Sequence, residues 1–397
     1  MIKRIRSEQL LPGMFIHDLN CGWIEHPFPF NSFRVKNEAT VRKVLANGIR
    51  EVYIDTAAGL DVADAQTKEE VDSEIHAGIT RVAEGAKPLP PTQLRDEIVV
   101  ARKVHSEANQ VVHNILTDVR LGKRIEVEQA DPVVEHITDS IFRNRDALTS
   151  LSRIKQKDNY TFQHSVSVCA LLVSFGHAMG VGKDELRALG IGGLLHDIGK
   201  MKVPDIVLNK PAALTAPELL VMQSHAALGR DILSQTSGVP ESAILVTGQH
   251  HERYDGTGYP DKLKESAISD YGQMASIVDV YDALTSNRVY HRGMEPTAAL
   301  KKLFEWSKFH FNEELVQQFI RVIGIYPVGT LVSLASGLLA VVVQQGENSL
   351  LHPVVRAVFD PEKGYVAPHD IDLSGGNDHI ANHEIPRNWG IDPFMYL

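Results

Sequence analysis

Apolar and polar positions follow three different patterns along the chain. Residues 2 to 55 combine strand-like stretches, GMFIH, FRV and EVYID, with a helical pattern from Glu38 to Ala46 that stops at Asn47-Gly48. From Leu94 to about Ile323, apolar residues recur at helical spacing, and loops rich in Gly, Pro and Asp separate the expected helices. After Tyr326-Pro327, the runs TLVSLAS, LLAVVVQQ and PVVRAVF are typical of antiparallel strands. The chain is therefore predicted to contain a small α+β domain, a helical domain and a short β-rich unit.

The segments between and after these patterns are harder to assign. From Asp61 to Gln93 the apolar periodicity fades, and KPLPPT at 87 to 92 cannot continue a helix, so we expect a tether. The last residues, from about Ser374, are expected to be irregular. The predicted boundaries are 1–62 for the N-terminal domain, 63–139 for a linker with connecting helices, 140–336 for the helical domain and 337–397 for the β-rich extension.

Composition narrows the classes of partner and compartment. The 397 residues carry a formal net charge of −10, from 40 Lys and Arg against 50 Asp and Glu, which disfavours long nucleic acids as partners. Cys21 and Cys169 match no metal or redox spacing, which suits a reducing compartment. No stretch reaches the roughly 20 apolar residues that a bilayer span needs, and no apolar region follows the basic start MIKRIRSEQLLPGM. We expect a cytoplasmic protein without a membrane span.

Two dipeptides carry candidate metal ligands. His196-Asp197, in GGLLHDIGK, places an imidazole and a carboxylate together at the end of a predicted helix. His250-His251 opens the loop HHERYDGTGYP, which contains too much Gly, Asp and Pro for a helix interior. Either pair alone has an ordinary alternative: a chance His-Asp pair in a chain with 18 His, or a solvated helix end beside Glu252 and Asp255.

Three further residues fit the same chemistry. Asp279, in MASIVDVYDALTS, would be costly to bury among apolar neighbours unless it is paired or bound to a cation. Asp282 shares its helical face and is expected to support a ligand rather than to be one. His164, in YTFQHSVSVCALLV, and His225, on a helix that begins at the capping box Thr215-Ala-Pro-Glu218, could each also be an ordinary core histidine.

Taken together, the order His, His-Asp, His, His-His, Asp on successive helices supplies donors for two ions. Asp197 is predicted to bridge them, with positions left for water and phosphate. Iron or manganese is expected first, with nickel, cobalt and zinc as alternatives. Two such ions would generate a bridging hydroxide at neutral pH for in-line attack on a phosphorus, so the pattern predicts a phosphohydrolase.

Basic residues and a tight loop lie near these ligands in the sequence. Lys200, Lys210 and Arg288 are candidates for binding phosphate oxygens, and Lys200 is also a candidate catalytic residue, although each could simply be solvated. Gly258-Tyr259-Pro260 would shape a loop beside the metals and is a candidate substrate contact, with a purely structural turn as the alternative.

Five segments resemble, in order and with similar intervals, the motifs of the HD-GYP family, a subset of the HD phosphohydrolase superfamily. They are YTFQHS, HDIGK, HAALG, HHERYDGTGYP and DVYDALTSNRVY, within roughly residues 140 to 336. The resemblance implies an all-helical domain that linearises cyclic di-GMP (c-di-GMP) to pGpG and in some members continues to GMP. It implies metal ligation by His164, His196, Asp197, His225, His250, His251 and Asp279, and phosphate binding by Lys200, Lys210 and Arg288. It further implies that Gly258-Tyr259-Pro260 contacts substrate or partners such as diguanylate cyclase domains.

The chain departs from the family pattern in one informative place. Some members have a Glu one helical turn before the first His and hold three metals, whereas this chain has Tyr160, which favours a binuclear centre and pGpG as product. The N-terminal segments LLPGMF, CGWIEHPF and EVYIDTAAGLD resemble an accessory domain found ahead of HD-GYP domains in proteobacteria, and that likeness implies no function. Two alternatives stay open: hydrolysis of another nucleotide, and a slow c-di-GMP sensor or docking platform acting through the GYP loop.

Overall fold

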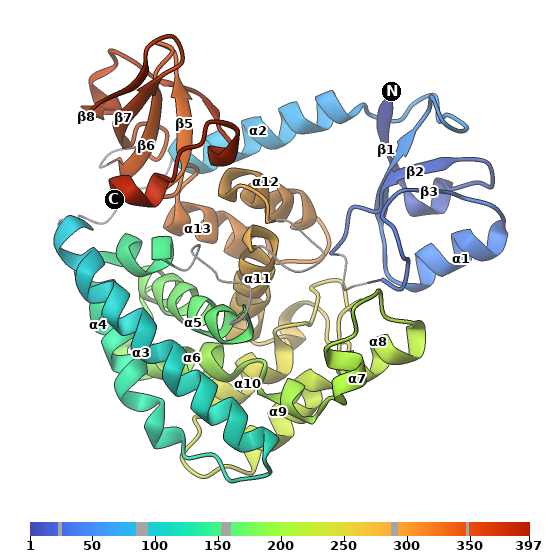
Figure 1. The fold of residues 1–397 in the computed structure, drawn as a ribbon. Helices are drawn as coiled ribbons and strands as arrows, with labels where there is room; N and C mark the ends of the chain where they lie inside the picture. The colour runs from blue at the N-terminus through green and yellow to red at the C-terminus, as the bar shows by residue number, and fades with distance from the viewer. Residues whose placement is uncertain (23–25, 85–93, 152–159, 287–292, 347–348) are drawn as a thin grey trace.

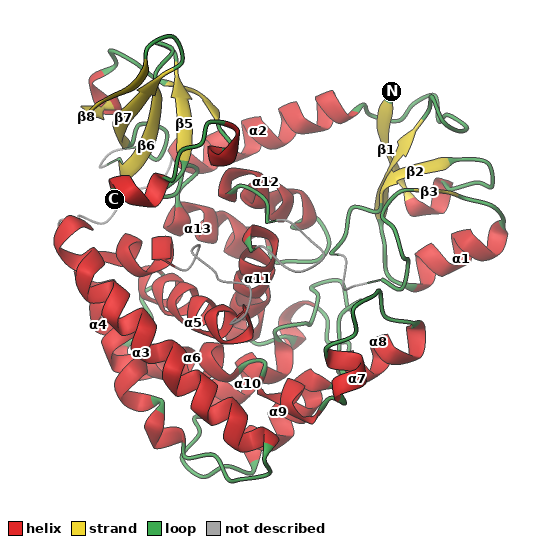
Figure 2. Ribbon diagram, in the orientation of Figure 1, coloured by secondary structure: helices red, strands yellow, loops and turns green. Residues whose placement is uncertain are grey.

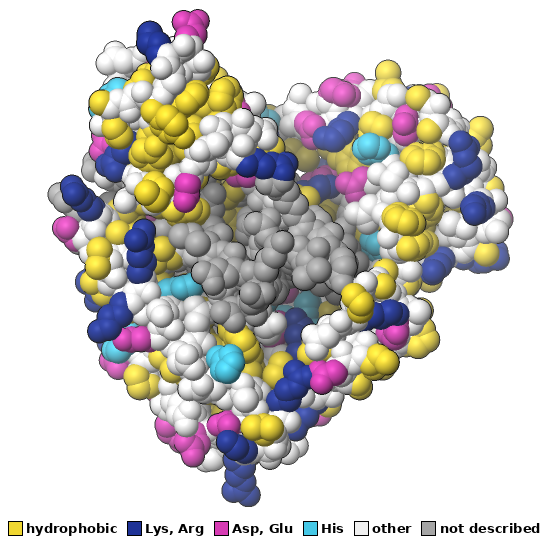
Figure 3. Space-filling model, viewed as in Figure 1, with side chains coloured by type: hydrophobic (Ala, Val, Ile, Leu, Met, Phe, Trp, Pro, Cys, Tyr) yellow, Lys and Arg dark blue, Asp and Glu magenta, His cyan; other side chains and the backbone are white. Residues whose placement is uncertain are grey.

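A computed structural model of the chain describes residues 1–22, 26–84, 94–151, 160–286, 293–346 and 349–397. It has the expected fold class: a small α+β domain, a central helical domain and a β-rich C-terminal unit (Figures 1 and 2). The N-terminal domain and the C-terminal unit form two lobes with a notch between them on the face drawn in Figure 3. Among the described helices, none combines the length and hydropathy that a bilayer span requires.

The N-terminal domain is a four-stranded antiparallel sheet with one helix. The strand order is β1 (Ile2–Arg6), β4 (Glu51–Asp55), β2 (Phe15–Asp18) and β3 (Phe33–Arg34). Helix α1 (Glu38–Ala46) has the predicted bounds, because Asn37 caps its start by accepting from Thr40 N at 3.0 Å. Gly48 follows its end with a φ of +74°, a conformation that glycine adopts without steric cost.

The expectation of a tether after this domain is wrong for residues 68–84. Helix α2 (Lys68–Glu84) forms here and buries Val71, Ile75 and Ile79. It packs on α12 (Pro296–Trp306) and α13 (Glu313–Ile323). Charged residues are frequent in α2, so its three apolar residues at one-turn spacing did not mark it as a helix in the sequence. Packing against α12 and α13 stabilises the helix instead. The segment KPLPPT lies outside the described residues.

The helical domain is assembled around α5 (Tyr160–Ala178), which packs against α4 (Asp131–Leu151), α6 (Lys183–Leu195) and α11 (Asp270–Thr285) (Figure 1). Besides α12 and α13, its other described helices are α3 (Leu94–Arg120), α7 (Asp205–Leu208), α8 (Ala216–Gln223), α9 (His225–Ser234) and α10 (Glu241–Gln249). The capping box at Thr215 and Glu218 is present. The helix predicted to run from it through His225 is divided at Ser224, so that His225 begins a separate helix.

The C-terminal unit is a five-stranded antiparallel sheet in the order β8, β7, β6, β5, β9. The strands are β5 (Leu331–Leu334), β6 (Leu339–Gln344), β7 (Val354–Asp360), β8 (Gly364–Asp372) and β9 (Ile380–His383). The expectation of irregular structure after Ser374 is wrong at β9, which pairs with β5 as a short edge strand of four residues, IANH. So short a strand shows no sustained apolar alternation in the sequence.

A buried polar network joins the N-terminal domain to α12. Glu305 is 4% exposed, and its Oε1 accepts from the Tyr53 hydroxyl at 2.6 Å and from Asn20 Nδ2 at 3.2 Å. Asn20 Oδ1 in turn accepts from Lys302 Nζ at 2.7 Å and from Trp306 Nε1 at 3.1 Å. A buried carboxylate needs such partners, so this network fixes how the two domains sit together.

Removing the Tyr53 hydroxyl tests that network. A Tyr53→Phe variant should lose about 1–2 kcal/mol of unfolding free energy, because Glu305 stays buried with one donor fewer. Tyr365→Phe is the matched control, since the Tyr365 hydroxyl donates to Gly390 O at 3.2 Å on an exposed strand; it should change stability by less than about 0.5 kcal/mol. Equal urea midpoints for the two variants would contradict the role given to Tyr53.

Candidate metal centre

Glycines bring the helices of the candidate centre close together. A Cβ on Gly193 of α6 would lie 2.9 Å from Cys169 Cα on α5, and one on Gly192 would lie 2.8 Å from Val246 Cβ on α10. A Cβ on Gly199, in the short 3-10 helix 198–202, would lie 1.9 Å from the backbone oxygen of His225. The glycines of GIGGLLHDIGK therefore permit the backbone approach that places α5, α9 and α10 around His196-Asp197.

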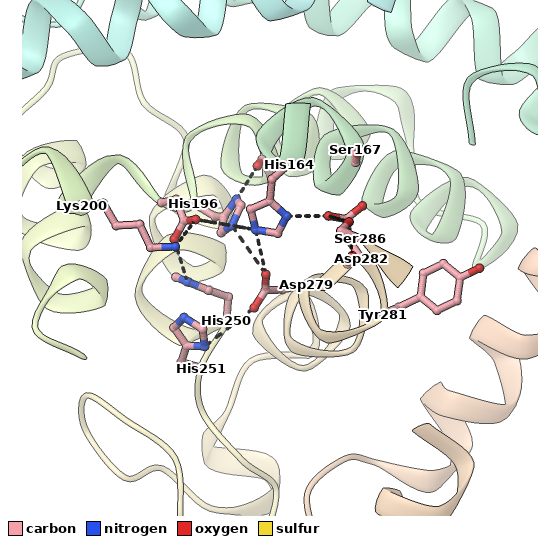
Figure 4. Close-up of polar contacts among 12 residues, drawn as sticks. His164, Ser167, His196, Lys200, His250, His251, Asp279, Tyr281, Asp282 and Ser286 are labelled. Carbon is pink, nitrogen blue, oxygen red and sulfur yellow. Dashed lines mark hydrogen bonds and ion pairs between the residues drawn. The ribbon is translucent and has the colours of Figure 1, made fainter. Parts of the chain in front are cut away.

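The structure brings all seven predicted metal ligands into one buried cluster. His164 lies on α5, His196-Asp197 at the end of α6, His225 at the start of α9, His250-His251 at the end of α10, and Asp279 on α11. The side chains of His164, His196, His225 and His250 are at most 3% exposed. Figure 4 shows His164, His196 and Asp279 pointing toward one another, with His250 and His251 to the lower left of Asp279.

Asp197 stands between two groups of donors. Its Oδ2 lies 3.4 Å from His196 Nε2 and 3.6 Å from His164 Nε2. Its Oδ1 lies 3.3 Å from His225 Nε2 and 3.8 Å from His250 Nε2. Each group of donor atoms, Asp197 with His164 and His196, and Asp197 with His225, His250 and His251, lies within 4.8 Å, a span that a metal ion can bridge.

The outer nitrogens of the imidazoles have acceptors that fix the rings. Nδ1 of His196, His225 and His250 each lies 2.7–2.8 Å from the backbone oxygen three residues earlier. Nδ1 of His164 lies 2.6 Å from Asp282 Oδ2, as expected for a supporting carboxylate. A neutral ring that donates from Nδ1 to its outer acceptor presents its Nε2 lone pair to the cluster, which is the arrangement of metal-ligating histidines.

The inward nitrogens are too close together to be left without a cation or a proton. Nε2 of His164 lies 3.2 Å from Nε2 of His196, and Nε2 of His225 lies 3.3 Å from Nε2 of His250. Burial lowers the pKa of His225 to about 4 and that of His250 to about 3, so both rings are neutral at pH 7. In the described part of the chain, Oδ1 of buried Asp197 also has no hydrogen-bond partner. These donors fit a divalent metal.

The carboxylates of the cluster are held in their charged form. Burial alone would raise the pKa of Asp197, but Lys200 and His196 hold it well below its usual range. Burial likewise opposes the charge of Asp279, whose pKa is nevertheless lowered by His164 and His251. Charged carboxylates and neutral imidazoles form the N/O donor set of hydrolytic metal sites.

The three predicted phosphate-binding cations have different surroundings. Lys200 Nζ lies 2.5 Å from Asp197 Oδ2 at the edge of the cluster and is 25% exposed. Lys210 Nζ lies 2.5 Å from Glu218 Oε2, the acid of the α8 capping box, so its contact here is with α8 rather than with the cluster. Arg288 lies outside the described residues, as does the side chain of Tyr160.

The loop with Gly258, Tyr259 and Pro260 lies directly on the cluster. Tyr259 N donates to His251 O at 3.1 Å, and the Tyr259 ring stacks on the His251 ring with centroids 4.6 Å apart. A Cβ on Gly258 would lie 2.3 Å from Arg253 N, so only glycine fits this path. The loop places an aromatic ring beside the metal ligands.

Sequence reasoning missed the groups that hold this loop. Glu252, treated only as part of a solvated helix end, is buried and accepts from Asp261 N at 2.8 Å and from Leu263 N at 3.0 Å. Asp255 pairs with Arg50 of the N-terminal domain at 3.2 Å. The acids were visible in HHERYDGTGYP, but nothing in the sequence identified their partners.

Two known protein families match the chain, one in its N-terminal part and one in its helical part. Residues 144–315 match the HD domain family, and residues 2–130 match a domain of unknown function, DUF3391. The chain is 37% identical to the cyclic di-GMP phosphodiesterase PA4108 of Pseudomonas aeruginosa, over 98% of this chain and 94% of the relative.

Two other relatives match a smaller part of the chain. The cyclic di-GMP phosphodiesterase response regulator RpfG of Xanthomonas campestris is 32% identical over 59% of this chain and 60% of its own length. The 3′3′-cGAMP-specific phosphodiesterase 1 of Vibrio cholerae is 36% identical over 37% of this chain and 34% of its own length. With an HD domain match, a relative aligned along nearly its whole length and all five motifs in place, the chain belongs to the HD-GYP family of HD-domain proteins and carries an N-terminal DUF3391 domain.

Proposed function

We propose that the protein is a metal-dependent phosphodiesterase that hydrolyses c-di-GMP to pGpG. The observation that carries the proposal is the position of Asp197, whose two oxygens face two separate groups of imidazole nitrogens. Such a carboxylate is suited to holding two divalent ions. The relative that aligns along nearly the whole chain is named a cyclic di-GMP phosphodiesterase, which supports c-di-GMP as the substrate.

In this proposal, His164 and His196 belong to one ion and His225, His250 and His251 to the other, with Asp197 shared and Asp279 beside both groups. Asp279 Oδ1 lies 3.1 Å from His164 Nε2, and its Oδ2 lies 3.8 Å from His251 Nδ1. Divalent ions here would neutralise phosphate charge and make water more acidic. Iron and manganese are the first ions to test.

The chain's own residues prepare the site around those ions. Asp282 orients the His164 ring, and the buried walls exclude bulk water from the donor atoms. Lys200 is partly exposed beside Asp197, where its ammonium group can bind a phosphate oxygen of the substrate. The Tyr259 ring offers a stacking surface at the open side of the cluster.

The substrate assay separates this proposal from the alternatives. Anaerobically purified, metal-assayed protein should convert c-di-GMP to pGpG faster than it converts 3′3′-cGAMP, the substrate in the name of the Vibrio relative. If the protein hydrolyses only 3′3′-cGAMP, that dinucleotide replaces c-di-GMP as the proposed substrate. If the metal-bound protein hydrolyses neither dinucleotide, a c-di-GMP sensor or docking platform is favoured. Docking of a diguanylate cyclase domain on the GYP loop stays a prediction from the family resemblance.

Loss of Asp197 should abolish both metal binding and hydrolysis. In Asp197→Ala, the two donor groups lose their shared oxygen atoms, so the metal content by mass spectrometry and the production of pGpG should both fall to background. Asp231→Ala, an exposed carboxylate on the helix of His225, is the control and should keep both. Hydrolysis of c-di-GMP by metal-free Asp197→Ala protein would disprove a metal-dependent mechanism.

Asp282 should tune metal affinity without being a ligand. Asp282→Ala frees the His164 ring, and metal affinity should fall about 10- to 100-fold, measured by competition with a chelator. Asp282→Asn keeps an acceptor for the Nδ1 proton and should lose less. Unchanged affinity in both variants would remove Asp282 from the centre.

The metal-depleted protein should lose stability on mild acidification. Since the folded-state pKa values of His225 and His250 lie below the unfolded value of about 6.5, unfolding takes up protons as the pH falls from about 6.5 toward 4. Burial would lower the pKa of His196, but Asp197 raises it, and this shift offsets part of the loss of stability. Tm by circular dichroism should therefore fall across that interval, and a Tm that rises on acidification would contradict the assignment of neutral rings.

A further inference from the structure

The N-terminal domain touches the loop that lies on the metal centre. Arg50 Nε lies 3.2 Å from Asp255 Oδ2, and Asp255 Oδ1 accepts from Thr257 Oγ1 at 2.6 Å. Gly48 lies so close to the same loop that a Cβ on it would be 2.9 Å from Thr257 Cβ. The turn after α1 is thus seated directly on the segment that leads to Gly258 and Tyr259.

A cleft lies between this turn and the helical domain. Its walls include Cys21, Asn47 and Gly48 from the N-terminal domain, and Gln223, His251 and Tyr259 from the helical domain. His251 is the most exposed of the clustered histidines: its side chain is 16% exposed, against at most 3% for the other four. The cleft therefore reaches the centre from its open side, and the N-terminal domain forms one of its walls.

The cleft has the chemistry to hold a nucleobase. Tyr259 supplies a ring for stacking, and Asn47 and Gln223 supply amides that can donate to and accept from base edges. Asn47 Nδ2 donates to Lys43 O at 2.6 Å, which holds the side chain in place while the amide keeps a second N–H and a carbonyl oxygen. A cyclic dinucleotide is much larger than its scissile phosphodiester, so its bases must lie outside the metal cluster.

The wall formed by the N-terminal domain is fixed in position. The network around Glu305 anchors Tyr53 and Asn20 to α12, and the contact of Arg50 with Asp255 anchors the turn at the other end. The domain is thus held at two separate places on the helical domain, with the cleft beside the second.

We propose that the N-terminal DUF3391 domain is part of the substrate site, and that its Asn47-Gly48 turn binds a nucleobase of the cyclic dinucleotide against Tyr259. The inference rests on the proposed function and extends it: the domain contributes directly to substrate affinity. Asn47 contacts the base, and Gly48 sets the distance between the turn and the GYP loop.

The test uses the full-length, metal-loaded protein with two paired variants. Asn47→Ala removes the amide from the cleft and also the bond to Lys43 O at the end of α1, so its control is Asn37→Ala, which removes the cap at the start of the same helix away from the cleft. Gly48→Ala is matched by Gly180→Ala, because Gly180 also has a positive φ, +77°, but a Cβ there would meet open space.

Three measurements separate substrate binding from structure: the Kd of a phosphorothioate analogue of c-di-GMP by calorimetry, KM and kcat for c-di-GMP, and turnover of bis(p-nitrophenyl) phosphate, which has no nucleobase. Asn47→Ala and Gly48→Ala should raise Kd and KM about five- to twentyfold, with kcat and turnover of the small diester within about twofold of wild type. Both controls should match wild type.

The outcomes distinguish the inference from the proposed function. Wild-type Kd and KM in both Asn47→Ala and Gly48→Ala overturn the inference, as does an equal rise in the controls or a parallel loss of small-diester turnover. Failure of the wild-type protein to hydrolyse c-di-GMP while it hydrolyses the small diester overturns the proposed function instead, and the Kd values then still decide whether the turn binds the nucleotide.

Discussion

The burial of imidazoles and charged carboxylates around one small space is the constraint on which the rest of this structure depends. The outer Nδ1 atoms of four rings lie against a backbone oxygen or Asp282, so the inner Nε2 atoms face one another and Asp197. Such a cluster is costly to bury without a cation, because lone pairs at hydrogen-bond distance repel and an unpaired carboxylate oxygen loses its hydration. The helices are packed through glycines to produce this arrangement, which shows that the site is built into the fold.

Much of the fold and nearly all of the cluster could be predicted from the sequence, for identifiable reasons. Helix α1 has a capping Asn before it and a Gly after it, and β4 is the compact run EVYID, so local chemistry was sufficient. The donors were recognisable because Asp279 lies in an apolar helix and His196-Asp197 at a helix end. No single one of these residues identifies the site. Their order along successive helices does.

The rest depends on contacts between distant residues. Helix α2 is stabilised by α12 and α13, more than 200 positions later, and β9 by β5, so neither had a strong local pattern. The contact of the Asn47-Gly48 turn with Thr257 likewise joins residues more than 200 positions apart. The sequence alone does not indicate a function for the N-terminal domain, because its candidate binding surface exists only where it meets the helical domain.

The long sequence separation of these partners has a consequence for biosynthesis. Tyr53 and Glu305 are 252 positions apart, so at about 5–20 residues per second the ribosome adds the carboxylate roughly 13–50 s after the phenol. During that interval the apolar face of α2 and the turn at Gly48 emerge from the exit tunnel before the surfaces against which they later pack have been synthesised. The nascent N-terminal domain therefore exposes these surfaces to chaperones during that interval, and the ligand cluster is completed only after Asp279, the last of its seven ligands along the chain, has been synthesised.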